Sequence, residues 1–114
     1  MPFVSDAAFE NKLVVITGGT SGIGLALAQA LYGHKARVVV VAHQQASIDR
    51  VLAQFGGPSK RFGAFVCDIG SSDDVVKVSA AIVAAYGSPD ILVNNAGYAT
   101  YSTFEQEEVQ EHLT

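Results

Sequence analysis

The stretch ITGGTSGIG, residues 16–24, joins an apolar run at 13–16 to a segment with helical spacing. It contains four glycines, Gly18, Gly19, Gly22 and Gly24. In a strand-to-helix turn, glycines permit the tight bend, the close approach of backbone to a phosphate, and the close packing of helix on strand. The free N–H groups and the positive dipole at the helix start then hold the anion. The stretch therefore predicts a phosphate-binding turn.

A glycine-rich turn alone is a weak signal, because a tight strand–helix turn can exist without a ligand. The context here is a strand before the glycines, a helix after them and a complete strand–helix–strand unit around them, which favours the ligand. No Gly-Lys-Ser or Gly-Lys-Thr follows the turn, so the sequence excludes the phosphate loop of nucleoside triphosphatases.

The composition is that of an ordinary globular protein, and it favours a small molecule as the ligand. The chain has 114 residues, 49% of them hydrophobic, and a formal net charge of −4 without any Lys/Arg cluster, which argues against nucleic acid or an anionic membrane as partner. A single cysteine excludes an internal disulfide, and the three histidines lie at no metal-ligand spacing. Without a bilayer-spanning run or a signal-peptide pattern, we expect a cytoplasmic protein with no metal.

Apolar runs alternate with segments of helical spacing along the chain. The runs, expected to be strands buried on both faces, lie at 13–16, 38–41, 62–66 and 91–93. The helical segments place on one face Ile23, Leu27 and Leu31, then Ile48, Val51, Leu52 and Phe55, then Val75, Val78, Ile82 and Val83. This order predicts an α/β fold, a Rossmann-like doubly wound parallel sheet. We expect one dinucleotide-binding domain over 1–114, with a loose lead-in at 1–10 and truncation after the fourth strand and the start of the next helix.

Three motifs resemble those of the short-chain dehydrogenases/reductases. TGGTSGIG at 17–24 resembles the Thr-Gly-x-x-x-Gly-x-Gly cofactor motif of that family, NNAG at 94–97 is similar to its Asn-Asn-Ala-Gly motif, and CDI at 67–69 resembles its adenine-contacting Asp. The motifs follow one another in the family's order. The resemblance implies an NAD(P)-dependent oxidoreductase that interconverts an alcohol and a carbonyl compound.

The resemblance also implies a cofactor site. Its expected residues are Gly18, Thr20, Ser21, Gly22, Ile23, Gly24, His43, Asp68, Ile69, Asn94, Ala96 and Gly97. Asp68 would accept a hydrogen bond from the adenine amino group while the backbone of Ile69 contacts the ring; the alternative is an Asp that caps the next helix. The amides of Asn94 and Asn95 would satisfy backbone groups where the sheet opens, and Ala96 and Gly97 would leave room for the ribose; the alternative is an ordinary strand-ending turn.

Cofactor choice depends on the end of the second strand. Folds that prefer NAD carry an acid about 20 residues after the glycine turn to bind the ribose hydroxyls. Ala42 occupies that place, so nothing there repels a 2′-phosphate, and a protonated His43 could pair with one. Ser21 stands where many NADP-preferring members of the family carry Lys or Arg. The sequence therefore favours NADP over NAD, with an exposed loop histidine as the alternative for His43.

The residues that carry the family's chemistry are absent from these 114 residues. No tyrosine is followed four residues later by lysine, and no lysine lies beyond Lys77. Without a positioned proton donor, hydride transfer to a carbonyl has no path. We therefore expect no catalytic residue in this chain, which resembles the cofactor-binding half of a reductase; the alternative is a catalytically silent dinucleotide-binding or assembly module. The apolar run ILVNN, residues 91–95, would form an unpaired edge, so we expect self-association or a homo-oligomer.

Overall fold

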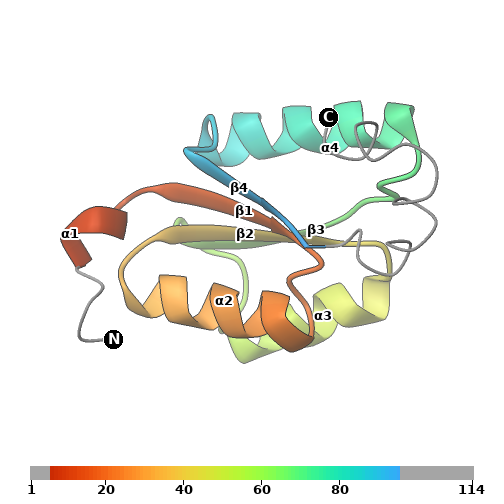
Figure 1. The fold of residues 1–114 in the computed structure, drawn as a ribbon. Coiled ribbons are helices and arrows are strands. Elements are labelled where there is room, and N and C mark those ends of the chain that lie inside the picture. Colours follow the sequence, from red (N-terminus) through yellow and green to blue (C-terminus); the bar gives the residue numbers. More distant parts are fainter. Residues whose placement is uncertain (1–5, 96–114) are drawn as a thin grey trace, which may run out of the picture.

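The computed structural model describes residues 6–95, in which strands and helices alternate as expected (Figure 1). In chain order the elements are α1 (Asp6–Phe9), β1 (Leu13–Thr17), α2 (Gly22–Gly33), β2 (Arg37–Ala42), α3 (Gln45–Gln54), β3 (Phe62–Val66), α4 (Ser72–Tyr86) and β4 (Ile91–Asn94). No helix among these residues is long and apolar enough to cross a membrane.

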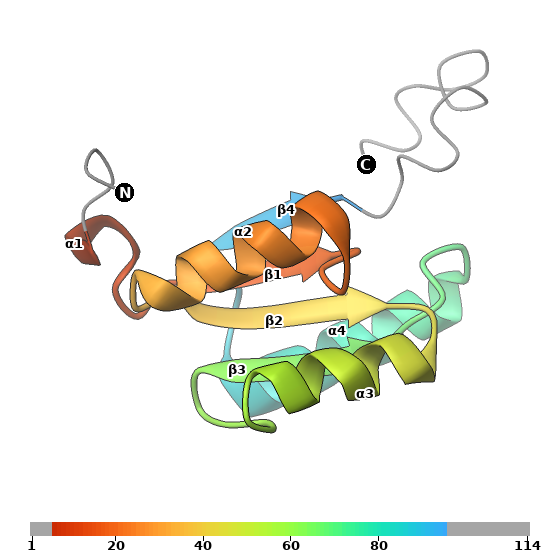
Figure 2. The ribbon, with the colours of Figure 1, turned by 90° about the horizontal axis from the view of Figure 1, so that it is seen from below.

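The strands form one sheet in the order β3-β2-β1-β4, and every pairing is parallel. Helices α2 and α3 cover one face and α4 lies on the other (Figures 1 and 2). This arrangement confirms the predicted Rossmann-like doubly wound α/β fold. Because parallel strands all end at the same edge, the segments that follow β1, β2 and β3 meet there, and this edge is where open α/β sheets bind ligands.

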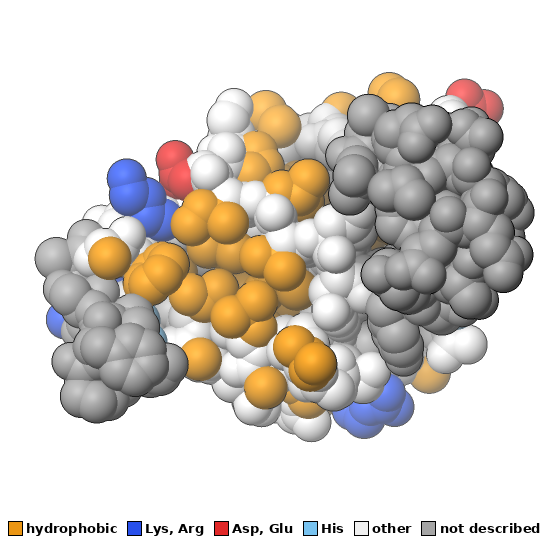
Figure 3. Space-filling view, in the orientation of Figure 1, with side chains coloured by type: hydrophobic (Ala, Val, Ile, Leu, Met, Phe, Trp, Pro, Cys, Tyr) orange, Lys and Arg blue, Asp and Glu red, His pale blue; other side chains and the backbone are white. Residues whose placement is uncertain are grey.

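The central strands are buried on both faces as expected, but β4 is not. Each residue of β1 is buried, and β2 is buried from Val38 onward. In β4 the side chains of Ile91 and Leu92 are 36% and 66% exposed, because β1 is the strand's one partner within the described sheet. Figure 3 shows hydrophobic side chains gathered over this part of the molecule. The expectation of a fully buried fourth strand was therefore wrong.

Two helix faces also differ from the expected ones. The buried residues of α2 are Gly24, Ala28 and Leu31, whereas Ile23 is 80% exposed. The helix turns this face to the sheet because its glycine packs directly on the turn after β1. On α4, Ile82 is buried but Val83 is 48% exposed. The predicted face of α3 is confirmed, with Ile48 and Val51 buried.

The expected loose lead-in contains one helical turn. Residues of α1 form this turn, and Lys12 N donates to Phe9 O at 2.9 Å to close it. The Phe9 ring packs against the hydrophobic core beside α2 and β2. This partial burial of Phe9 accounts for the helical turn, which the sequence did not indicate.

Candidate functional site

The turn between β1 and α2 has glycine where a side chain would be strained or blocked. Gly18 and Gly22 have φ angles of 70° and 57°, in the left-handed region that glycine enters without strain. A Cβ on Gly24 would collide with the Gly18 carbonyl and lie 2.8 Å from Asn95 Nδ2. The first and third glycines of the motif therefore provide the bend and the close helix–strand contact that the sequence predicts.

The N-terminus of α2 is left without a cap by its own chain. Ser21 is the N-cap residue, in an extended conformation with φ −157° and ψ 165°, and its side chain makes no capping hydrogen bond. The first turn of α2 contains no acidic residue. The first N–H groups of a helix have no partner within the helix, and its dipole is positive at this end. This end of α2 is therefore suited to an anion.

Side-chain hydrogen bonds connect the glycine turn to the end of β4. The Thr17 hydroxyl donates to Asn94 Oδ1 at 2.9 Å and accepts from Asn95 N at 2.9 Å. Asn95 Nδ2 donates to the Gly18 carbonyl at 3.3 Å. These amides satisfy backbone and hydroxyl groups where the sheet opens, which is the role expected of the Asn pair. Thr17 was missed as a contributor, although it is the first residue of the glycine motif.

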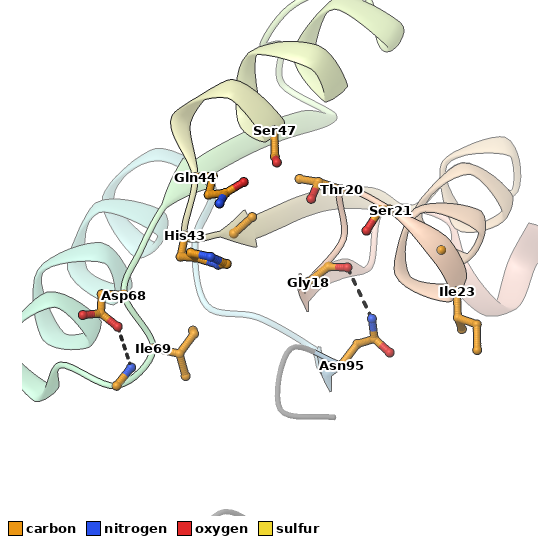
Figure 4. Close-up of a pocket in the computed structure, with 13 residues that line it drawn as sticks. Gly18, Thr20, Ser21, Ile23, His43, Gln44, Ser47, Asp68, Ile69 and Asn95 are labelled. Carbon is orange, nitrogen blue, oxygen red and sulfur yellow. Dashed lines mark hydrogen bonds between the residues drawn. The ribbon is translucent and has the colours of Figure 1, made fainter. Parts of the chain in front are cut away.

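A cleft of about 750 Å³ lies along the carboxyl edge of the sheet (Figure 4). Eight of the predicted residues line it: Gly18, Thr20, Ser21, Gly22, Ile23, His43, Asp68 and Ile69. They come from the β1–α2 turn, the end of β2 and the β3–α4 loop, so three segments that are distant in sequence form one wall.

The remaining predicted residues do not line this cleft. Gly24 packs against the backbone of Gly18, and Asn94 accepts a hydrogen bond from the Thr17 hydroxyl. Ala96 and Gly97 lie outside the described residues. The wall also contains Gln44, Ser47 and Gly70, which were not predicted, and Ala42 and Asn95, which the sequence singled out without assigning them to the cofactor.

Asp68 has a structural role as well as a place on the cleft wall. Its Oδ1 accepts from Gly70 N at 3.0 Å, and its backbone N donates to Asp74 Oδ2 at 2.6 Å. The helix itself is capped by Ser71, whose hydroxyl accepts from Asp74 N at 3.2 Å. Asp68 thus stabilises the turn before α4, and its predicted contact with adenine stays a prediction.

Cys67 lies beneath this loop and is a buried residue, with 2% of its surface exposed. Burial raises the pKa of its thiol above the ordinary 9.0, and the charge of Asp74, a hydrogen bond to Asp74 and the charge of Asp68 raise it further. The thiol is therefore kept neutral, which agrees with a small core residue.

Fold and site together define an open α/β protein with a nucleotide-binding type of glycine turn at the carboxyl edge of a parallel sheet. The model of the short chain dehydrogenase family matches residues 12–113, and the chain belongs to this family.

Relatives with known names agree with this assignment. Dehydrogenase/reductase SDR family member 4 from Sus scrofa is 39% identical over 87 residues, which cover 76% of this chain and 31% of that protein. D-threitol dehydrogenase from Mycolicibacterium smegmatis is 33% identical over 106 residues, which cover 93% of this chain and 41% of that protein. The chain thus spans 31% to 41% of the length of these two relatives.

Solved structures show the same fold. The 3-ketoacyl-(acyl-carrier-protein) reductase from Brucella melitensis, complexed with NADH, matches with a TM-score of 0.66 and 31% identity over 73% of this chain and 33% of that chain. A short chain dehydrogenase from Bacillus anthracis matches with a TM-score of 0.68 and 30% identity over 75% of this chain and 34% of that chain.

Proposed function

We propose that this chain binds a nicotinamide dinucleotide and is the cofactor-binding part of an NAD(P)-dependent oxidoreductase acting on an alcohol or a carbonyl compound. The observation that carries the proposal is the cleft at the carboxyl edge of the sheet, which contains the uncapped end of α2. Membership of the short chain dehydrogenase family supports it. The related reductase from Brucella melitensis is complexed with NADH.

The residues present fit a dinucleotide. Gly18, Ser21 and Gly22 surround the end of α2, where backbone N–H groups would hold the pyrophosphate. Gly22 has open space where a side chain would project, so the backbone is accessible to the phosphates. Asp68 and Ile69 on the opposite wall would bind the adenine. When bound, the cofactor supplies a hydride to the substrate or accepts one from it.

NADP is the proposed preferred cofactor. Ala42, at the end of β2, has no carboxylate that would bind the ribose hydroxyls of NAD or repel a 2′-phosphate. His43 follows it on the wall and, when protonated, supplies a positive charge.

These 114 residues alone are proposed to bind the cofactor without turnover. The titratable side chains of the described cleft wall are His43 and Asp68, and this wall has neither tyrosine nor lysine. This favours the alternative function, a silent binding module. Cofactor-dependent activity of the oxidoreductase would need a proton donor supplied by residues outside this set. A cytoplasmic location stays a prediction.

Titration of the purified chain with NADPH and NADH, followed by nicotinamide fluorescence and thermal shift, tests this proposal. We expect micromolar binding of NADPH, weaker binding of NADH, and no oxidation of NADPH when carbonyl compounds are added. Adenosine 5′-monophosphate is the control ligand, because it lacks the pyrophosphate. Failure of both dinucleotides to bind would contradict the proposed function, and turnover would contradict the silent state of the chain.

Self-association of the chain is proposed to occur through β4. Its exposed Leu92 and Ile91 lie at the edge of the described sheet, where backbone groups without a partner strand favour pairing with a second copy. Sedimentation equilibrium should show dimers or larger species at tens of micromolar, and Leu92→Lys should shift the chain toward the monomer. A monomeric parent chain would contradict this.

A further inference from the structure

The two edge strands of the described sheet are protected to different degrees. At β3 the turn before the strand folds back on it, so that Ser59 N donates to Phe62 O at 2.8 Å and Phe62 N donates to the Ser59 hydroxyl at 3.1 Å. The Tyr86 hydroxyl lies 2.9 Å from the same Phe62 carbonyl. Lys60 and Arg61 place two positive charges beside the start of the strand. An edge with charges and occupied backbone groups resists the addition of another strand.

The other edge strand, β4, has none of these features (Figures 1 and 2). Within Ile91–Asn94 there is no charged residue and no proline, and the register with β1 runs without a bulge. Leu92 pairs with Val15, which belongs to the hydrophobic cluster under α4, so the Leu92 side chain stands on the α4 face of the sheet. There it is 66% exposed. Of the two edges of the described sheet, β4 is therefore the one that can take up another strand.

The outward backbone groups of β4 belong to Ile91 and Val93. Asp90 N donates to Leu13 O at 2.8 Å, so the backbone groups of Asp90 point toward β1. Because these groups alternate in direction from one residue of a strand to the next, those of Leu92 also point toward β1. The N–H and C=O groups of Ile91 and Val93 point away from the sheet, toward the place of a further strand.

We propose that two copies of the chain pair through β4 in the antiparallel direction, about a two-fold axis at Leu92, so that two four-stranded sheets become one. This inference rests on the self-association proposed above and specifies its geometry. Leu92 of one copy lies opposite Leu92 of the other, and Ile91 lies opposite Val93. The outward groups of Ile91 and Val93 then pair with one another, and the two exposed leucine side chains cover each other.

The neighbouring antiparallel registers leave backbone groups without a partner. If Ile91 lay opposite Ile91 of the other copy, Val93 would face Pro89, which has no N–H to donate. If Val93 lay opposite Val93 of the other copy, Ile91 would face Asn95, whose N–H already donates to Thr17 Oγ1 at 2.9 Å. The central register is the one of the three in which every outward group of the strand has a partner.

Charge also favours the antiparallel direction. In the central register Asp90 of one copy lies opposite Asn94 of the other. Asn94 Oδ1 accepts from the Thr17 hydroxyl at 2.9 Å, so Nδ2 is the atom of this amide that can donate to a carboxylate. A parallel pairing would instead place the two Asp90 carboxylates opposite each other, which is unfavourable.

Disulfide trapping tests this geometry, since the chain's Cys67 is buried and does not compete. Residues opposite each other in a non-hydrogen-bonded antiparallel pair have Cα atoms about 4.5 Å apart, within the range of a disulfide. Under mild oxidation with copper(II)–phenanthroline, Leu92→Cys should therefore give a band of doubled mass on a non-reducing gel. The parent chain should stay at the mass of one copy on the same gel.

Ile91→Cys and Val93→Cys are the matched controls, with side chains on the other face of the same strand. In the central register each lies diagonal to its own counterpart at about 7 to 8 Å, too far for a disulfide, so neither should cross-link alone. An equal mixture of the two variants should cross-link, because Ile91 of one copy lies opposite Val93 of the other.

Cross-linking of Ile91→Cys or Val93→Cys alone would overturn the register. If no variant cross-linked at a concentration where the parent chain sediments as a dimer, pairing through β4 would be wrong. A monomeric parent chain would overturn the self-association and this inference together. NADPH titration of Leu92→Cys in reducing buffer keeps the cofactor proposal separate, because Leu92 is not part of the cleft wall and its replacement should leave the affinity unchanged.

Discussion

The N-termini of α2 and α4 lie at the same edge of the sheet and are built in opposite ways. At α4, the Ser71 hydroxyl caps Asp74 N, and Asp73 and Asp74 place two carboxylates in the first turn. At α2, Ser21 makes no side-chain cap and the first turn has no acid. The N-terminus of α4 is capped by its own side chains, whereas that of α2 has no side-chain cap.

The two helix ends differ in whether side chains of the same chain satisfy their first backbone N–H groups. A helix end without a side-chain cap exposes backbone N–H groups that an anion can bind. The N-terminus of α3 also lacks a side-chain cap, so it is the glycine turn that distinguishes the end of α2. The carboxylates at α4 interact favourably with the helix dipole and would repel a phosphate. Under the proposed function, this contrast places the pyrophosphate of the cofactor on the α2 side. The following predictions test this contrast by making one end resemble the other.

The largest effect is expected from Gly24→Val. The new side chain would meet the Gly18 carbonyl and Asn95 Nδ2, so α2 must move away from β1. We expect a loss of about 2 kcal/mol or more in the free energy of unfolding and at least about a hundredfold loss of NADPH affinity. Urea unfolding and fluorescence titration measure the two quantities.

Gly33→Ala is the matched control in the same helix, because nothing lies within 4 Å of its added methyl group. It should leave binding unchanged and stability unchanged or raised by up to about 1 kcal/mol. If Gly24→Val bound NADPH as tightly as the parent chain, close packing would not be the purpose of this glycine.

The second prediction makes α2 resemble α4. Ser21→Asp places a carboxylate at the uncapped end, where it caps the helix and occupies the expected place of the pyrophosphate charge. We expect stability unchanged or raised by about 0.5 kcal/mol, with NADPH bound about 10- to 100-fold more weakly. Thermal melts and titrations check both.

Ser21→Asn separates charge from capping, since the amide can cap without repelling phosphate. Its NADPH affinity should stay within about fivefold of the parent chain. Equal losses in the Asp and Asn variants would mean that the pyrophosphate does not lie at this helix end.

The third prediction removes the cap at the other end. Ser71→Ala eliminates the hydroxyl that accepts from Asp74 N, and should lower the free energy of unfolding by about 1 kcal/mol. NADPH affinity should change by less than about threefold, because this helix end does not hold the phosphates. Ser72→Ala, one residue into the exposed first turn, is the control and should change stability by less than about 0.5 kcal/mol. A larger effect on binding than on stability would contradict the division between the two ends.

The smallest effect concerns pH at the α4 end. The pKa of Cys67 in the folded chain is raised above 9.0, first by burial and then by Asp74, so the fold favours the neutral thiol. The resulting stability is present in full below about pH 9 and is lost as the pH rises through the raised value. Urea unfolding between pH 8 and 10 should show a smaller decrease in Cys67→Ala than in the parent chain. Equal decreases in both would assign the alkaline loss to other groups, such as Tyr86, whose pKa burial also raises.

Much of the fold could be predicted because its signals are local. Runs of β-branched residues and glycines at a turn each act over a few residues, and the alternation of strands with helices predicts parallel pairing. The wrong expectations concern exposure. Ile23 and Leu92 are apolar and fall within regular patterns, yet both are exposed, because burial depends on what packs against an element.

Some residues of the candidate site could be predicted from local motifs, and others could not. Gly18, Gly22 and Asp68 were found from their motifs, since each backbone or charge requirement is specific to a residue type. Gln44 and Ser47 carry no such signal, and they reach the cleft only because α3 starts directly beside the end of β2.

By itself, the sequence determined the alternation of strands and helices, the glycine turn and the family, because these depend on backbone freedom and side-chain type over short distances. The tertiary structure alone decided that the uncapped start of α2 lies beside the cleft and which residues share its wall with His43. Those properties depend on how the carboxyl ends of separate strands meet, and parallel pairing brings together segments that the chain keeps far apart.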